Sequence, residues 1–78
     1  MFGKRLRAMR MKRGFTQQKI SELLGIALRT YQHYEEGSRS PSLDLLRQIG
    51  DILNVPIDFL LERDEFLQSL GVSVDEYQ

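Results

Sequence analysis

The chain has 78 residues, enough for one domain with a modest core but below the size at which a single core is comfortably stable alone. It has no cysteine, which excludes disulfides and thiolate metal sites, and its one histidine cannot build a zinc site by itself. The net charge is zero, yet residues 1–47 carry +6 and residues 48–78 carry −6. An anionic surface would therefore attract the first part of the chain and repel the second. From charge alone, two ordinary solvated faces are an equal alternative.

The first predicted element is a helix that ends at Gly14 and carries Phe2, Leu6 and Met9 on one face. Residues 2–11 alternate apolar and basic positions, unlike a signal peptide, and no apolar run approaches a membrane span. No useful length of the chain alternates with a period of two, so every element is expected to be helical. We therefore expect an all-α, soluble, cytoplasmic protein without membrane contact.

The second predicted helix runs from Thr16 to Leu24. The Thr16 hydroxyl is expected to cap it by accepting a hydrogen bond from a free amide of the first turn. Ile20, Leu23 and Leu24 are expected to be its buried stripe, and Gly25 ends it where a left-handed residue is needed.

The third predicted helix, from about residue 27 to residue 34, is stopped by Gly37. At 100° per residue it has two opposite faces. The expected core face is Ala27, Tyr31 and Tyr34. The expected exposed face is Leu28, Arg29, Gln32 and His33.

A loop precedes the fourth helix, which Ser42 is expected to cap and Asn54 to end. Pro56 then begins a fifth, short helix that carries Phe59 and Leu60. The buried stripe of the fourth helix is expected to be Leu43, Leu46, Ile49 and Leu53.

From Glu62 the composition becomes acidic, but Phe66, Leu67 and Leu70 keep helical spacing. The Ser-x-x-Glu pattern at residues 73–76 has the form of a capping box, which predicts one more short helix. We expect a domain over residues 1–61 and an acidic helical extension over residues 62–78.

Two short helices joined by a tight turn at glycine, the second with polar side chains on its open face, are the parts of a helix-turn-helix. The first helix of that motif crosses the sugar-phosphate backbone, and the second enters the major groove, which is wide enough for an α-helix. The open face of the third helix is therefore expected to meet base edges.

The segments LRAMRMKRGFTQQKISELLGI and TYQHYEEGSRSPSLDLLRQIGDILNV resemble the phage repressor and Cro type of helix-turn-helix domain, also called the xenobiotic response element family. The marks are TQ at the start of the second helix, LG at the turn, YE-x-G at the end of the recognition helix and P-x-x-x-x-L at the fourth helix. The resemblance implies a five-helix, lambda-repressor-like DNA-binding domain, here with a C-terminal helical extension. It also implies a homodimer on palindromic double-stranded DNA, without a cofactor.

The resemblance further implies roles for individual residues. Arg29 suits guanine, Gln32 suits adenine and Leu28 can touch a thymine methyl. The expected base contacts are Leu28, Arg29, Gln32 and His33. The expected phosphate contacts are Thr16, Gln17, Thr30, Ser38, Arg39 and Ser40. Arg10 is expected to pair with Glu35.

Three positions depart from the family pattern. Ala27 cannot cap the recognition helix, a loss of about 1 kcal/mol. Tyr31 stands where a smaller aliphatic residue is commoner, and Ser21 replaces the usual alanine where the two helices approach closely.

Several assignments have an ordinary alternative. A lone histidine is commonly a solvated surface residue. For His33 we slightly prefer a base or phosphate contact, because it lies on the same face as Arg29. The Arg10–Glu35 pair is either an exposed pair worth little or a partly buried one, and the resemblance favours the second. The basic residues of the first helix are expected to be solvated: Lys4, Arg5 and Arg7.

The apolar residues of the extension, Phe66, Leu67 and Leu70, either fold back on their own domain or pack against a second copy. Dimerisation is preferred because a repressor needs two half-sites about 34 Å apart.

The resulting hypothesis is a sequence-specific DNA-binding transcriptional regulator, a repressor of bacterial or phage type. The alternative is an antitoxin or interaction module whose residues 62–78 bind a partner protein. An enzyme is not expected, because the sequence has no cysteine, one histidine, and no glycine-rich phosphate loop or carboxylate pair at telling spacing.

Overall fold

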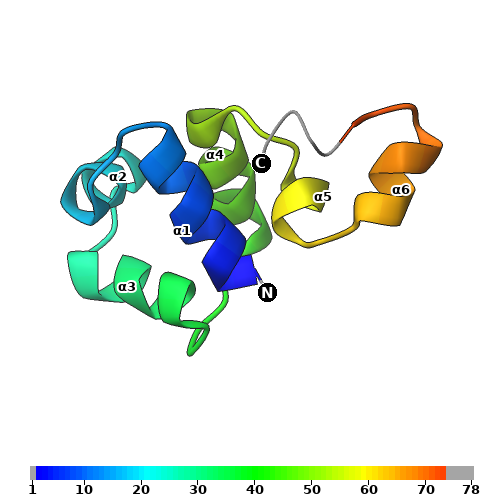
Figure 1. Cartoon of the computed structure of the whole chain (residues 1–78). Helices are drawn as coiled ribbons and strands as arrows, with labels where there is room; N and C mark the ends of the chain where they lie inside the picture. Colours follow the sequence, from blue (N-terminus) through cyan, green and yellow to red (C-terminus); the bar gives the residue numbers. More distant parts are fainter. Residues whose placement is uncertain (1, 74–78) are drawn as a thin grey trace.

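Six helices follow one another in the computed structural model, which describes residues 2–73 (Figure 1). They are α1 (Phe2–Lys12), α2 (Gln17–Leu24), α3 (Leu28–Glu36), α4 (Leu43–Leu53), α5 (Ile57–Leu60) and α6 (Asp64–Ser69). No strand occurs within these residues, and the prediction of an all-α fold is confirmed. The further helix predicted at residues 73–76 lies outside the described residues, apart from Ser73.

The helix ends follow from local side chains. The Thr16 hydroxyl accepts a hydrogen bond from the Lys19 amide at 3.0 Å, and the Ser42 hydroxyl accepts one from the Leu45 amide at 3.2 Å. Asn54 ends α4 in the left-handed conformation, with φ 55°. Ala27 gives α3 no side-chain cap, yet the helix begins there with Ala27 in an extended conformation. Both predicted polar caps are therefore confirmed.

One hydrophobic core joins α1 to α5, and α6 adds to it. Its fully buried hydrophobic side chains come from five helices and are Leu6, Met9, Ile20, Tyr31, Ile49, Leu53 and Leu60. The prediction that Tyr31 and Tyr34 lie in the core is confirmed, and their rings meet edge to face with centroids 6.5 Å apart.

The prediction of a buried side chain was wrong at three positions. Leu23 is 48% exposed because α2 is rotated so that Ile20, Ser21 and Leu24 face inward. Leu43 is 84% exposed because it occupies the first position of α4, before the helix reaches the core at Leu46. Ala27 is exposed because its extended backbone does not follow helical periodicity.

The last described helix lies beyond α5, at the opposite end of the molecule from α2 and α3 (Figure 1). The Arg5 guanidinium of α1 holds it by two hydrogen bonds to Asp64, of 2.7 and 2.8 Å. Arg5 also donates to the Phe59 carbonyl oxygen at 2.8 Å, and its guanidinium lies 4.5 Å from the centroid of the Phe59 ring. Arg5, expected to be solvated, therefore attaches α6 to the domain.

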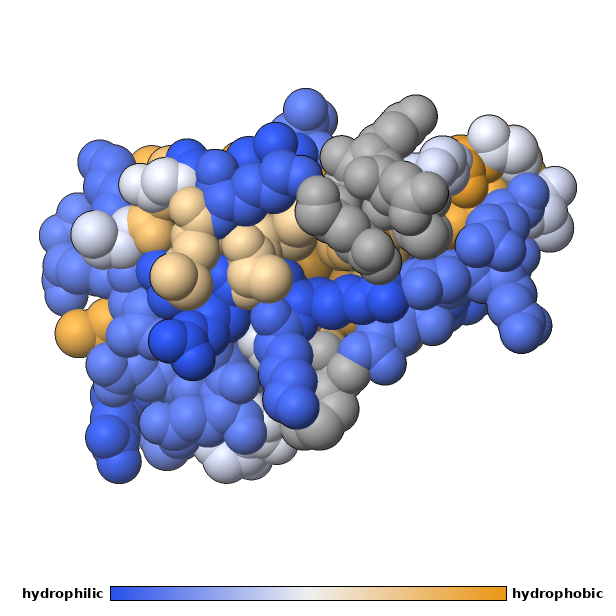
Figure 2. All heavy atoms as spheres, viewed as in Figure 1, coloured by the Kyte–Doolittle hydropathy of each residue, from blue (hydrophilic) through white to orange (hydrophobic). Residues whose placement is uncertain are grey.

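The apolar residues of α6 and its C-cap are divided between core and surface. Leu67 is 3% exposed and packs in the core of its own chain, whereas Phe66 is 40% and Leu70 63% exposed. In this view hydrophobic side chains show near α6 and also over α1, while the surface over α3 is mainly hydrophilic (Figure 2). Of the three residues predicted for dimerisation, Phe66 and Leu70 are thus left open to a partner.

Candidate nucleic-acid interface

The α2–α3 pair has the geometry of two helices joined by a tight turn. Gly25 ends α2 with φ +70°, a backbone conformation that favours glycine. The Ile26 amide then donates to the Ser21 carbonyl oxygen at 3.0 Å, which closes the turn. Ser21 is buried where the two helices meet, and its hydroxyl donates to the Gln18 carbonyl oxygen at 2.7 Å. Serine is accommodated at this close approach because its hydroxyl is satisfied within α2.

The four predicted base-contact residues lie on α3 but differ in exposure. Arg29 is exposed, as predicted. The prediction of a fully open face was wrong for the other three, which are half-buried: Leu28, Gln32 and His33. Gln32 and His33 are half-buried because each side chain is held by a hydrogen-bond partner in the protein.

The imidazole of His33 faces the loop that follows α3. Its Nδ1 lies 2.9 Å from the Ser38 hydroxyl oxygen and 3.6 Å from a Glu36 carboxylate oxygen. The His33 carbonyl oxygen accepts hydrogen bonds from the amides of Gly37, Ser38 and Arg39, at 3.0, 3.1 and 3.3 Å. His33 therefore organises the loop that carries three of the predicted phosphate contacts.

The predicted phosphate contacts come from three places, the start of α2, Thr30 within α3, and the segment after α3. Thr16 is exposed at the N-terminus of α2, where free backbone amides and the helix dipole favour an anion. Ser38, Arg39 and Ser40 are exposed, and Thr30 is half-buried. Gln17, also half-buried, has protein partners that the sequence did not indicate.

Below this surface, Arg10 of α1 is paired with Glu35 of α3. The Arg10 Nε donates to Oε2 of Glu35 at 2.6 Å, and the two side chains are 11% and 5% exposed. Arg10 also donates to the Phe15 carbonyl oxygen at 2.8 Å. Of the two alternatives considered from the sequence, an exposed pair and a partly buried one, the structure has the second. Through these hydrogen bonds Arg10 joins α1 both to α3 and to Phe15, just before α2.

Three further side chains join this pair, the buried Tyr31 and the half-buried Gln17 and Gln32. The Gln17 Nε2 donates to Oε1 of Glu35 at 3.0 Å, and the Gln32 Nε2 donates to the Gln17 Oε1 at 3.3 Å. The Tyr31 hydroxyl donates to Oε2 of Glu35 at 2.6 Å. Sequence reasoning placed Tyr31 only in the core, although its i, i+4 spacing to Glu35 puts both on one helix face.

The protonation states of this cluster follow from burial and hydrogen bonding. Burial raises the pKa of the Glu35 carboxyl, but hydrogen bonds from Arg10, Tyr31 and Gln17 outweigh it and hold the pKa below its ordinary value. Burial, and then the hydrogen bond to Glu35, raise the pKa of the Tyr31 hydroxyl far above its ordinary value. Glu35 is therefore an acceptor and Tyr31 a donor at neutral pH.

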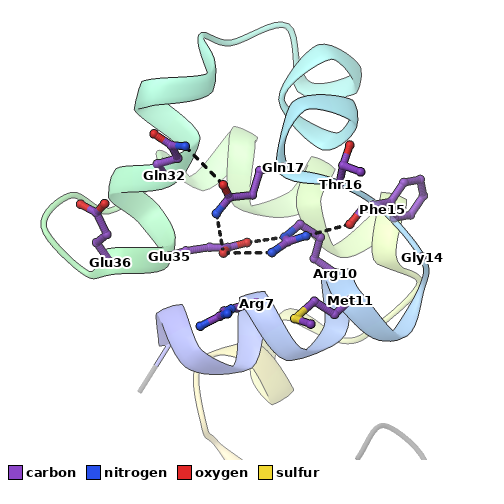
Figure 3. A pocket seen from close by; sticks show the side chains of 10 residues that line it. All are labelled: Arg7, Arg10, Met11, Gly14, Phe15, Thr16, Gln17, Gln32, Glu35 and Glu36. Carbon is purple, nitrogen blue, oxygen red and sulfur yellow. Dashed lines mark hydrogen bonds and ion pairs between the residues drawn. The ribbon is translucent and has the colours of Figure 1, made fainter.

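This network forms the floor of an open hollow of about 940 Å³ between α1, the start of α2 and α3 (Figure 3). Arg7, Thr16, Gln17 and Gln32 line it together with Arg10 and Glu35. Within residues 2–73, no three His, Asp or Glu side chains are grouped so that they could hold a metal ion. The hollow gathers amide, hydroxyl and guanidinium groups from α1, the start of α2 and α3.

A comparison with family models assigns residues 6–60 to a helix-turn-helix family. The chain belongs to that family. The match includes both helices of the motif and the core around them, and it agrees with the resemblance to the phage repressor and Cro type. No solved structure matches this helix-turn-helix chain.

Curated relatives of this helix-turn-helix chain include regulators from phages and bacteria. An SPbeta prophage-derived uncharacterized HTH-type transcriptional regulator of Bacillus subtilis is 42% identical over 62 residues, covering 80% of this chain and 57% of the relative. The HTH-type transcriptional regulator ImmR of Bacillus subtilis is 40% identical over 63 residues, which cover 81% of this chain and 50% of ImmR. The cryptic phage CTXphi transcriptional repressor RstR of Vibrio cholerae is 31% identical over 65 residues, which cover 83% of this chain and 59% of RstR.

The chain spans about half the length of the first two of these relatives. Within residues 2–73, no helix has both the length and the apolar composition needed to cross a membrane.

Proposed function

We propose that this helix-turn-helix chain is a sequence-specific DNA-binding transcriptional regulator that acts as a repressor. It binds a palindromic operator as a homodimer, with α3 in the major groove. The observation that carries the proposal is the α2–α3 pair, in which Gln17 of α2 and Gln32 of α3 are hydrogen-bonded at one open surface. The names of the relatives, which include a phage repressor, support it.

Recognition in this proposal divides between bases and phosphates. Arg29 donates to O6 and N7 of guanine, Gln32 contacts adenine, and Leu28 touches a thymine methyl. His33 adds a base or phosphate contact. Phosphates are held by the start of α2, by Thr30 of α3 and by the segment after α3. The residues are Thr16, Gln17, Thr30, Ser38, Arg39 and Ser40.

The charge distribution supports the same orientation. Residues 1–47, which contain the helix-turn-helix, carry the excess of positive charge, and residues 48–78 carry the excess of negative charge. A chain charged in this way presents α2 and α3 to DNA while α6 is repelled from it. Phosphate contacts release counterions, so binding should weaken steeply as salt rises.

The homodimer is proposed to form through the α6 end, where Phe66 and Leu70 are exposed beside the buried Leu67. In such a dimer the two α3 helices must reach half-sites about 34 Å apart.

The test is a selection of random DNA duplexes against the purified chain, followed by sequencing of the enriched fragments. We expect an inverted repeat with half-sites about one helical turn apart, bound with an affinity that falls steeply between low and physiological salt. Enrichment of no sequence, with weak binding of every duplex, would overturn the proposal.

A second candidate is an antitoxin or interaction module in which residues 62–78 bind a partner protein. The observation that favours it is the pair of exposed apolar residues, Phe66 and Leu70, on an acidic extension. The double substitution Phe66→Ser and Leu70→Ser separates the two candidates. A dimer face predicts loss of the dimer and of tight operator binding, measured by light scattering and DNA titration. A face for another protein predicts that both are retained.

A further inference from the structure

We propose that Tyr31 is a positioning residue for base recognition, which acts through Glu35 and Gln17 to hold the side-chain amide of Gln32 in one of its two orientations. In that orientation Gln32 reads an A·T pair whose adenine belongs to the strand that Gln17 contacts. This inference rests on the proposed function, in which Gln32 lies in the major groove.

A chain of hydrogen bonds leads from the core to the surface. The Tyr31 hydroxyl donates to Glu35 Oε2 at 2.6 Å, Gln17 Nε2 donates to Glu35 Oε1 at 3.0 Å, and Gln32 Nε2 donates to Gln17 Oε1 at 3.3 Å. Figure 3 shows the last two links, with Gln17 lying between Glu35 and Gln32. The chain begins at a fully buried residue and ends on the recognition helix.

Each link fixes the next because donors and acceptors must alternate. A carboxylate accepts only, so Gln17 must turn its NH₂ group to Glu35 and its oxygen away from it. That oxygen also accepts only, so Gln32 must in turn direct its NH₂ group to Gln17. A flipped Gln32 would place its oxygen against the Gln17 oxygen, with no proton between them.

The fixed amide leaves Gln32 with one N–H and its oxygen free. Adenine offers the matching pair at its major-groove edge, an acceptor at N7 and a donor at N6. The amide nitrogen of Gln32 lies on the side of Gln17, to which it donates. N7 is the adenine atom nearer to the backbone of its own strand. The adenine therefore lies on the strand whose phosphates Gln17 contacts. Thymine in its place would present O4 and a methyl group instead.

Tyr31 is needed because Arg10 alone does not fix the carboxylate. Arg10 donates to Oε2 at 2.6 Å and reaches Oε1 only at 3.4 Å. The Tyr31 hydroxyl adds a second short hydrogen bond to Oε2, which leaves Oε1 directed at Gln17. Without that hydroxyl, the carboxylate can turn so that the longer hydrogen bond from Arg10 to Oε1 shortens, and Oε1 moves away from Gln17.

The test uses the selected operator with each of the four base pairs at each position of a half-site. Four proteins are compared, namely the wild-type chain and the variants Tyr31→Phe, Tyr34→Phe and Gln32→Ala. Gln32→Ala identifies the position that Gln32 reads, where the wild-type chain should prefer adenine by about 10-fold. Tyr31→Phe should reduce that preference to about 3-fold and leave the other positions unchanged.

Tyr34→Phe is the matched control, because it removes the hydroxyl of the neighbouring buried tyrosine, which lies outside this hydrogen-bond chain. It should keep the full preference. Urea unfolding of each variant separates loss of stability from loss of base preference, since a merely structural role for Tyr31 lowers stability and leaves the preference unchanged.

If Tyr31→Phe keeps the wild-type preference at that position, the inference is wrong while the proposed function stands. A preference for thymine or guanine at the Gln32 position would also overturn it. If the wild-type chain selects no operator, the proposed function itself fails and this inference fails with it.

Should circular dichroism show Tyr31→Phe to be unfolded, Gln17→Met breaks the same chain at a less buried residue. The adenine preference is then expected to fall in the same way, and its retention would overturn the inference.

Discussion

Arg10 and Glu35 join α1 to the last turn of α3 through a hydrogen bond of 2.6 Å, with both side chains almost removed from solvent. Replacing Arg10 with Met leaves the Glu35 carboxylate without its charged partner. We expect a loss of about 3 kcal/mol in the free energy of unfolding, measured by urea titration.

The matched control is Arg47→Met. Arg47 lies 3.9 Å from Asp44, but both side chains are largely exposed, so its loss should cost less than about 1 kcal/mol. Equal losses for the two variants would show that the Arg10–Glu35 pair contributes no more than a surface pair.

The lowered pKa of Glu35 makes stability depend on pH. Its ordinary value is 4.5, and a folded value below it means that the unfolded chain binds the proton more tightly. The stability contributed by ionised Glu35 is therefore complete above pH 4.5 and is lost as pH falls through the lower folded pKa. Urea titrations of the wild-type chain and Glu35→Gln should differ most near neutral pH and converge in acid. A difference that stays constant down to about pH 2.5 would contradict this assignment.

Gly3 lies where α1 meets the backbone at the end of α3. A Cβ at this position would overlap the Glu35 carbonyl oxygen and lie 2.9 Å from the carbonyl carbon. Gly3→Ala should therefore cost about 2 kcal/mol in spite of the better helix propensity of alanine. Lys4→Ala, at the exposed neighbouring position, is the control and should change stability little. A stable Gly3→Ala variant would mean that α1 and α3 can separate at no cost.

The Arg5–Asp64 contact should control how firmly α6 is attached. Asp64→Asn removes the carboxylate that accepts both guanidinium hydrogen bonds but leaves the contact of Arg5 with Phe59. Amide hydrogen exchange in α6 should become faster while exchange in α4 is unchanged. Asp44→Asn, which breaks the exposed pair with Arg47 within α4, serves as the control and should leave exchange in α6 unchanged. Unchanged exchange in Asp64→Asn would assign the attachment to Leu67 alone.

Arg29 and Arg39 should affect DNA binding in different ways if the proposed function holds. Arg29→Ala should relax the preference at one base position, at a cost of about 1–3 kcal/mol for the preferred sequence. Arg39→Ala should weaken binding to all sequences alike and reduce the slope of the salt dependence by about one unit. Titration of the operator and of single-base variants at several salt concentrations distinguishes the two. Identical effects of both variants on all sequences would remove Arg29 from base readout.

Local sequence was sufficient for the helices and the turn, because their determinants lie within a few residues of one another. The hydroxyls of Thr16 and Ser42 cap helices that begin next to them, and Gly25 supplies the left-handed residue at the turn. The Arg10–Glu35 pair was anticipated from the family resemblance and not from residue spacing, since the two residues come from different helices.

Tertiary packing decided which side of each helix is buried and which polar groups meet. Periodicity defines a stripe on α2 but not its rotation, so only packing could place Ser21 inside and Leu23 outside. Leu67 is buried in the core, and Arg5, which lies 59 positions before Asp64, joins α1 to α6.

The sequence by itself determined an all-helical chain with a helix-turn-helix, since capping, glycine turns and apolar spacing are local properties. Only the tertiary structure decided that Tyr31, Glu35, Gln17 and Gln32 form one hydrogen-bond chain. The reason is physical: the direction of a side-chain amide depends on partners that another helix brings to it.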